Sequence, residues 1–204
     1  MKQGVLDRQG YSISWAIEHR SKHSGSACGD GYLLRFIGPV LVAAVVDGTG
    51  SGTAAAQAAN QCLRRLSEAE HPDLRQIFAL SHQALKGTRG AALGVALISL
   101  ESLTLDWAAM GDIDGVLLQG RSQTDSVIQC GGTLGLAFGS LLPQRQALQP
   151  PATIVLVSDG ISASYRSQLD AYESAADLAH NTVLQHGRQN DDAIALAVKI
   201  GAAP

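Results

Sequence analysis

The sequence predicts an α+β protein, a four-layer α-β-β-α sandwich in which two antiparallel sheets face each other and helices flank them. Segments with strand periodicity occur in clusters, whereas the helical segments form one pair and one single helix, and this grouping favours antiparallel sheets. Apolar residues make up 46% of the 204 residues, enough to bury a substantial core, and only 4% are aromatic. The length fits one domain spanning residues 1–204.

The N-terminal part is expected to form three strands. Tyr11–Glu18 alternates between apolar and polar residues and is predicted to be the first strand. A small, polar loop over residues 22–29 follows. Tyr32–Ile37 and Val40–Val46 are then expected to pair through a turn at Gly38-Pro39.

Three helices are expected. Ser51–Ala69 is rich in Ala, Gln, Leu and Arg and lacks proline, with Ser51 or Thr53 available as its cap. Pro72–Lys86 has apolar residues at helical spacing and a proline suited to a first turn. Asp170–Gly187 is predicted to be the third helix, ended by its glycine.

From Ala91 onward the apolar period becomes that of strands. Three consecutive segments are expected to form an antiparallel meander, namely Ala91–Leu100, Thr104–Met110 and Ile113–Gln119. Four further strands are predicted at Ser126–Cys130, Gln144–Leu148, Thr153–Ser158 and Ala193–Ile200. A glycine-rich loop is expected over residues 131–139.

Composition excludes several classes of function. The formal charge is −3 without a basic block, so no nucleic-acid partner is expected. No apolar run approaches the roughly 20 residues that cross a bilayer, and the N-terminus lacks a signal-peptide pattern, so a cytoplasmic protein without a membrane partner is expected. Cys28, Cys62 and Cys130 match neither a disulfide framework nor a zinc site and are expected to be reduced.

Acidic residues stand at the ends of predicted strands or in tight turns. Asp47 and Asp159 each follow an apolar strand and precede a glycine, Asp30 lies between two glycines, and Asp191 and Asp192 precede the last strand. Any one of them could cap a turn. Together they favour a site for a hard divalent cation, Mg²⁺ or Mn²⁺, because such cations prefer oxygen ligands.

Other sites fit the sequence less well. Residues 47–52 are glycine-rich but lack the lysine of a P-loop and the spacing of a dinucleotide fingerprint. Neither Ser51 nor Ser158 lies in the G-x-S-x-G pattern of a serine nucleophile. The six histidines are scattered and expected to be exposed, with His23 a candidate exception in the loop before Asp30.

Six motifs occur in a specific order, namely CGD, VVDGTGSG, RGAALGVALISL, AAMGDIDGVLL, VLVSDGIS and NDDAIALAVKI. In this order they resemble the metal-dependent serine/threonine protein phosphatases of the PPM family, also called protein phosphatase 2C-like, over roughly residues 25–200. Within it the chain is most similar to the SpoIIE/RsbU/RsbX branch. The short length, the CGD motif and the Lys86, Arg89 and Gly90 segment are most like RsbX-type members.

The resemblance implies two antiparallel sheets flanked by helices and a centre of two Mn²⁺ or Mg²⁺ ions where the sheets meet. Asp47 matches the aspartate that bridges both metals, and Asp159 the aspartate of the late S-D-G motif; these two are the implied catalytic residues. The implied metal ligands are Asp30, Asp47, the Gly48 carbonyl, Asp159 and Asp191, with Asp112 matching a weaker third-metal position.

The resemblance also implies an activity, the hydrolysis of phosphoserine or phosphothreonine by a water that bridges the two metals. RsbX-type members act on phosphorylated STAS-domain proteins of the stressosome, so RsbR- and RsbS-like partners are implied. The alternatives are a PPM phosphatase acting on an anti-anti-sigma factor, an inactive phosphatase-like binding module, and a small-molecule phosphatase.

Two positions depart from the family pattern. Many members carry a general-acid histidine two residues after the bridging aspartate, where this chain has Thr49. Many also hold the phosphate with an arginine near the N-terminus, for which Arg20 and Lys22 are the nearest candidates.

Overall fold

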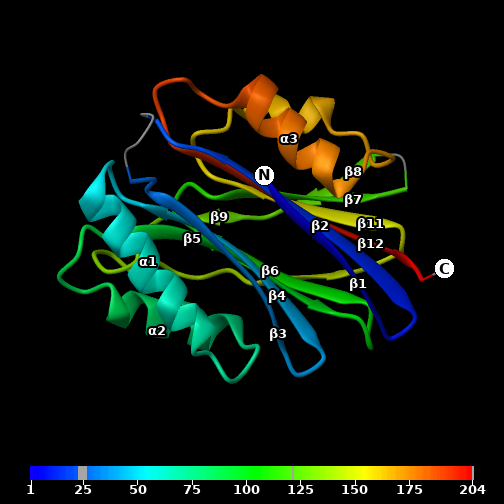
Figure 1. The fold of residues 1–204 in the computed structure, drawn as a ribbon. Coiled ribbons are helices and arrows are strands. Elements are labelled where there is room, and N and C mark those ends of the chain that lie inside the picture. The colour runs from blue at the N-terminus through cyan, green and yellow to red at the C-terminus, as the bar shows by residue number, and fades with distance from the viewer. Residues whose placement is uncertain (23–26, 121, 204) are drawn as a thin grey trace.

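A computed structural model describes residues 1–22, 27–120 and 122–203 of the chain. Two β-sheets face each other, with α3 over the outer face of one and α1 and α2 over the outer face of the other (Figure 1). The predicted α-β-β-α sandwich is therefore confirmed.

The first sheet has the strand order β1-β2-β12-β11-β7-β8, and every pair in it is antiparallel. Its strands are β1 (Lys2–Arg8), β2 (Tyr11–Arg20), β7 (Asp114–Gln119), β8 (Ser122–Ser126), β11 (Ala152–Val157) and β12 (Ala193–Ala202).

The second sheet has the order β10-β6-β5-β4-β3, also antiparallel, and the two-residue strand β9 adds a parallel pairing to β6. Its strands are β3 (Asp30–Ile37), β4 (Val40–Gly48), β5 (Ala91–Ser99), β6 (Thr104–Met110), β9 (Gln129–Cys130) and β10 (Gln144–Ala147). The edge position predicted for the segment at Gln144 is confirmed.

Each space between layers holds its own apolar cluster. Trp107 and Ile13 belong to the cluster between the two sheets, Phe78 to the cluster under α1 and α2, and Tyr165 to the cluster under α3. Central strands such as β4 and β11 are buried on both faces, which explains why their sequences are continuous runs of apolar residues. These buried strands form the rigid base of the acidic positions at their ends.

The helices begin later than the sequence predicts. α1 (Thr53–Ser67) starts after Gly52 and has no side-chain cap, so the expected cap by Ser51 or Thr53 is wrong. α2 (Leu74–Ala84) starts after Asp73, whose carboxylate accepts a 2.7 Å hydrogen bond from the backbone N–H of Gln76.

The third helix, α3 (Ala175–His186), is preceded by a turn because Ser174 caps it, accepting a hydrogen bond from the N–H of Asp177. The prediction that it starts at Asp170 is therefore wrong. A short 3₁₀ helix, η1 (Ala163–Gln168), was not predicted. No helix in the described part of the chain is long and apolar enough to cross a membrane.

Three strand predictions need correction. The single strand predicted over Ser126–Cys130 is wrong, because β8 ends at Ser126 and Gln129–Cys130 forms β9 in the other sheet. β1 is an edge strand with few apolar residues, so its alternation is weak and the predicted first strand is in fact the second. The expected meander is broken after Met110, because β7 belongs to the other sheet. Gly111, with φ of 80°, makes this crossing, and it carries Asp112 to the edge where the two sheets meet.

Candidate metal centre

Four aspartates from distant parts of the chain line one cavity of about 380 Å³. Asp47 comes from the end of β4, Asp112 from the crossing between sheets, Asp159 from just after β11 and Asp191 from just before β12. The cavity lies where β4 of one sheet approaches β11 and β12 of the other. The fold thus gathers four of the five aspartates that the sequence singled out as metal ligands.

The fifth aspartate, Asp30, lies beside this cavity but does not line it. It is the first residue of β3 and pairs directly with Asp47 on β4, whereas the sequence suggested a position before the strand. The buried hydroxyl of Ser158 donates a 2.7 Å hydrogen bond to Oδ2 of Asp30 and accepts a 3.1 Å bond from the N–H of Ile194. Ser158 therefore orients a carboxylate, a role that nothing in its sequence context signalled.

The adjacent Asp191 and Asp192 have different surroundings. The buried carboxylate of Asp192 accepts hydrogen bonds from the backbone N–H groups of Lys22, at 2.7 Å, and Gly29, at 2.6 Å. Asp191 faces the cavity, and its Oδ1 accepts a 3.0 Å bond from the N–H of Asp192. Asp192 thus ties the loop before β3 to the loop before β12. His23, the candidate exception among the histidines, lies outside the described residues.

The glycines after Asp47 and Asp159 allow two close backbone contacts. A Cβ on Gly48 would overlap the carbonyl of Ala55 in the first turn of α1. A Cβ on Gly160 would overlap the carbonyl oxygen of Asp192. Only glycine permits such approaches, so the first brings α1 against the end of β4 and the second brings the loop of Asp191 against Asp159.

Burial and mutual repulsion disfavour ionised carboxylates in this cluster. Burial, reinforced by the charges of Asp30 and Asp159, raises the pKa of Asp47 to about 9. Burial raises the pKa of Asp30 to about 7, and the hydrogen bond from Ser158 limits this rise. The pKa of Asp159 is also raised, mainly by burial and then by the charge of Asp191. Such a cluster of perturbed carboxylates is typical of a functional site.

The donor set fits a hard divalent cation. Within residues 1–22, 27–120 and 122–203, no lysine, arginine or histidine forms an ion pair with Asp30, Asp47, Asp159 or Asp191. Within the same residues, no three acidic, histidine or cysteine side chains are already arranged as a metal-binding group. The acidic residues that line the cavity offer carboxylate oxygens, which Mg²⁺ and Mn²⁺ prefer.

The basic residues near the cavity differ in their roles. The guanidinium of Arg20 donates a 2.6 Å hydrogen bond to the carbonyl of Arg188 and packs against Gly187, so it supports the chain before Asp191. Lys22 lines the cavity itself, as does Thr49. Of the two phosphate-binding candidates from the sequence, the structure places only Lys22 at the acidic site.

The two facing sheets, with acidic residues at their common edge, define a protein with the protein phosphatase 2C-like fold. The family model described as stage II sporulation protein E (SpoIIE) matches residues 39–201, so the chain belongs to the SpoIIE family.

One curated relative and two solved structures illustrate the similarity. Phosphoserine phosphatase RsbX of Bacillus subtilis (strain 168) is 21% identical over 181 residues, which are 88% of this chain and 91% of that protein. One of the solved structures comes from work on the bacterial stressosome, described as a modular system adapted to control secondary messenger signalling. That chain is 25% identical to this one, with a TM-score of 0.83, and the match covers 92% of this chain and 99% of that one. RsbX crystallised with magnesium is 19% identical, with a TM-score of 0.83, covering 98% and 100%.

Gly160→Ala is expected to displace the loop that carries Asp191, because the added methyl group would overlap the Asp192 carbonyl. Overpacking of this kind lowers the free energy of unfolding by about 1–3 kcal/mol, which urea denaturation would measure. The matched control is Gly201→Ala, where a Cβ would meet nothing within 4 Å; it should change stability by less than about 0.5 kcal/mol. Equal stability of the two variants would contradict this account of the glycine.

Asp47→Asn is expected to stabilise the metal-free protein at alkaline pH. The pKa of Asp47 rises from 3.8 to about 9 on folding, so the folded state binds its proton more tightly. The carboxyl therefore destabilises the fold progressively as the pH rises from about 4 towards 9. In a chelator at pH 8, the variant should exceed the wild type in free energy of unfolding by an amount on the order of 1 kcal/mol or more, with the difference vanishing near pH 4. A variant that is less stable than the wild type at pH 8 would refute this.

Proposed function

We propose that the chain is a metal-dependent protein-serine/threonine phosphatase in which residues 1–204 form one catalytic domain that uses two Mn²⁺ or Mg²⁺ ions. The observation that carries the proposal is the cavity lined by four aspartates from four separate segments. Membership of the SpoIIE family and the similarity to a phosphoserine phosphatase support it.

The proposed ligands are those that the family resemblance implies, and the cavity lined by four of their aspartates supports the set. Asp47 and Asp159 would bind the ions from opposite sheets, and Asp30, Asp191 and the Gly48 carbonyl would complete the set; Asp112 would serve a weaker third site. When bound, the ions supply positive charge that acidifies an attacking water and neutralises the phosphoryl oxygens.

Other residues would position these ligands and the substrate. Ser158 fixes the orientation of the Asp30 carboxylate, and Asp192 holds the loop that precedes β3. Lys22, on the cavity wall, would pair with a phosphoryl oxygen of the substrate. Thr49, at the position of the family's general acid, cannot release a proton at neutral pH, so the leaving serine alkoxide takes its proton from water or another group.

The proposed substrates are phosphorylated STAS-domain proteins of the stressosome, with RsbR- and RsbS-like partners. The similarity to RsbX and to a chain from work on the stressosome supports this choice. Incubation with Mn²⁺ and phosphorylated STAS-domain proteins, followed by measurement of phosphate release, tests it. Phosphate release from a phosphorylated anti-anti-sigma factor, and not from stressosome proteins, would instead identify the anti-anti-sigma factor as the substrate.

Asp47→Asn and Asp159→Asn are each expected to reduce Mn²⁺-dependent phosphate release by at least about a hundredfold, because each removes a ligand charge from the centre. Ser158→Ala should reduce it by roughly tenfold or more, since it removes a hydrogen bond that orients a ligand. The measurement is the initial rate on a phosphoserine peptide.

Asp7→Asn provides the control for these variants, because Asp7 is an exposed aspartate on β1 away from the cavity. It should retain the wild-type rate within about twofold. Undiminished phosphate release by both Asp47→Asn and Asp159→Asn would contradict the proposal. Absence of any Mn²⁺-stimulated cleavage in the wild type would instead indicate a binding module, and cleavage of metabolites alone would indicate a small-molecule phosphatase.

A further inference from the structure

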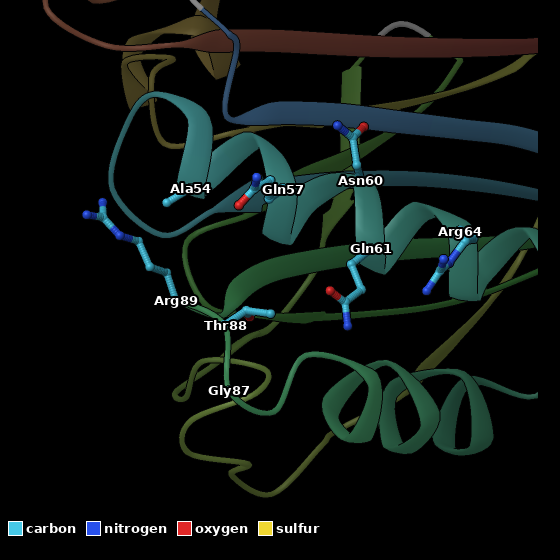
Figure 2. A pocket seen from close by; sticks show the side chains of 8 residues that line it. All are labelled: Ala54, Gln57, Asn60, Gln61, Arg64, Gly87, Thr88 and Arg89. Carbon is cyan, nitrogen blue, oxygen red and sulfur yellow. The ribbon is translucent and has the colours of Figure 1, made fainter.

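A second hollow, of about 730 Å³, lies between α1 and the turn that leads from α2 to β5 (Figure 2). This groove is lined by Ala54, Gln57, Asn60, Gln61, Arg64, Gly87, Thr88 and Arg89. Figure 2 shows Arg89 beside the start of α1 and Arg64 further along the same helix, with Gln61 and Thr88 between them. The groove therefore has one cationic side chain towards each end and neutral polar groups between.

The charge of the groove is opposite to that of the whole protein. Of the residues that the structure describes, its lining includes two arginines and no acidic residue, although the chain has a net charge of −3. Arg64 and Arg89 are exposed, and in the part of the chain that the structure describes neither guanidinium has an ion-pair or hydrogen-bond partner. The two cationic groups are thus available to an external anion.

Arg89 stands at the junction between the groove and the acidic cavity. Its Nη1 lies 2.9 Å from the position that a Cβ on Gly50 would take, and Gly50 lines the acidic cavity. The loops also touch through their backbones, since the N–H of Thr49 donates a 3.0 Å hydrogen bond to the carbonyl of Gly90. A ligand in the groove would therefore end beside the acidic cavity.

The backbone that carries Arg89 is fixed by its neighbours. The hydroxyl of Thr88 donates a 2.7 Å hydrogen bond to the carbonyl of Leu85 and accepts a 3.0 Å bond from the N–H of Gly90. Gly90 adopts φ of 81°, and a Cβ there would lie within 3 Å of the Leu134 carbonyl oxygen. The backbone at Arg89 is therefore fixed, and its guanidinium moves only by rotation of the side chain.

The groove has the length of a short peptide. The ten-residue step along α1 from Ala54 to Arg64 corresponds to about 15 Å, since an α-helix rises 1.5 Å per residue. An extended chain covers this distance with about four to five residues. The amide side chains of Gln57, Asn60 and Gln61 offer hydrogen-bonding groups for such a chain.

We propose that this groove binds an acidic polypeptide segment of the protein substrate that lies next to the phosphorylated residue. Arg89 pairs with an acidic side chain close to that residue, and Arg64 pairs with one about four residues further along. The inference rests on the proposed phosphatase function, which it deepens by naming a sequence preference. Among the described residues that line the groove none is aromatic and could stack on a base, which favours a peptide over a nucleic acid.

Binding is tested first, without metal and without turnover. Fluorescence anisotropy would follow a labelled Asp/Glu-rich hexapeptide, its Asn/Gln analogue and a single-stranded oligonucleotide of similar charge. The acidic peptide should bind in preference to the analogue and the oligonucleotide. Arg64→Gln and Arg89→Gln should each weaken its binding about threefold, and together about tenfold, as expected for exposed charge pairs that salt screens.

The matched control is Arg65→Gln, on the same helix but outside the groove lining. Arg65 pairs with Glu68 at 3.1 Å, so its charge is already engaged. This variant should bind the acidic peptide as the wild type does. Equal binding of the acidic and neutral peptides, tighter binding of the oligonucleotide, or an equal effect of Arg65→Gln would each overturn the proposal.

Turnover gives the second readout. Phosphoserine peptides with an acidic or a neutral segment beside the phosphoserine would be compared by kcat/KM with Mn²⁺. The wild type should prefer the acidic peptide about tenfold, mainly through KM, and the double variant should lose this preference. Equal hydrolysis of both peptides by the wild type would overturn the groove proposal and leave the phosphatase intact. Binding of the acidic peptide without any hydrolysis would support the groove and overturn the proposed function.

Discussion

Two close backbone contacts, at Gly48 and Gly160, decide where the acidic side chains of the cavity lie. Each glycine follows an aspartate at the end of a buried strand, and each allows another segment to approach where a side chain would block it. The contact at Gly160 brings the loop of Asp191 to Asp159, and the contact at Gly48 brings α1 to Asp47. The two rigid sheets therefore present their carboxylates to one point.

The fold holds these carboxylates close together against their mutual electrostatic repulsion. Burial and neighbouring negative charge raise the pKa values of Asp30, Asp47 and Asp159, so the metal-free cluster destabilises the fold when it is ionised. The hydrogen bond that Ser158 donates to Asp30 offsets part of this effect. The metal-free site lowers the free energy of unfolding, and a bound cation would raise it again. Functional sites commonly lower the stability of the free protein in this way.

The sequence was sufficient for the fold class and for the aspartates at strand ends, because buried strands and strand-Asp-Gly patterns are local signals. The residue pattern alone could not separate Asp191 from Asp192, and only the family resemblance selected Asp191 as a ligand, because their roles depend on which loop lies against each carboxylate. The sheet change after Met110 was missed because β6 and β7 have the same periodicity, and only tertiary pairing assigns them to different sheets. The groove beside Arg89 was equally hidden, because it joins residues from α1 and from the turn before β5.

The central claim is that the acidic cavity binds divalent cations through aspartates of both sheets. The most direct measurement is the number of Mn²⁺ ions bound per chain, obtained by electron paramagnetic resonance of free Mn²⁺ during titration. The account predicts two ions for the wild type and for Asp7→Asn, and loss of binding in the double variant Asp47→Asn/Asp159→Asn. Absence of binding in the wild type, or undiminished binding in the double variant, would contradict it.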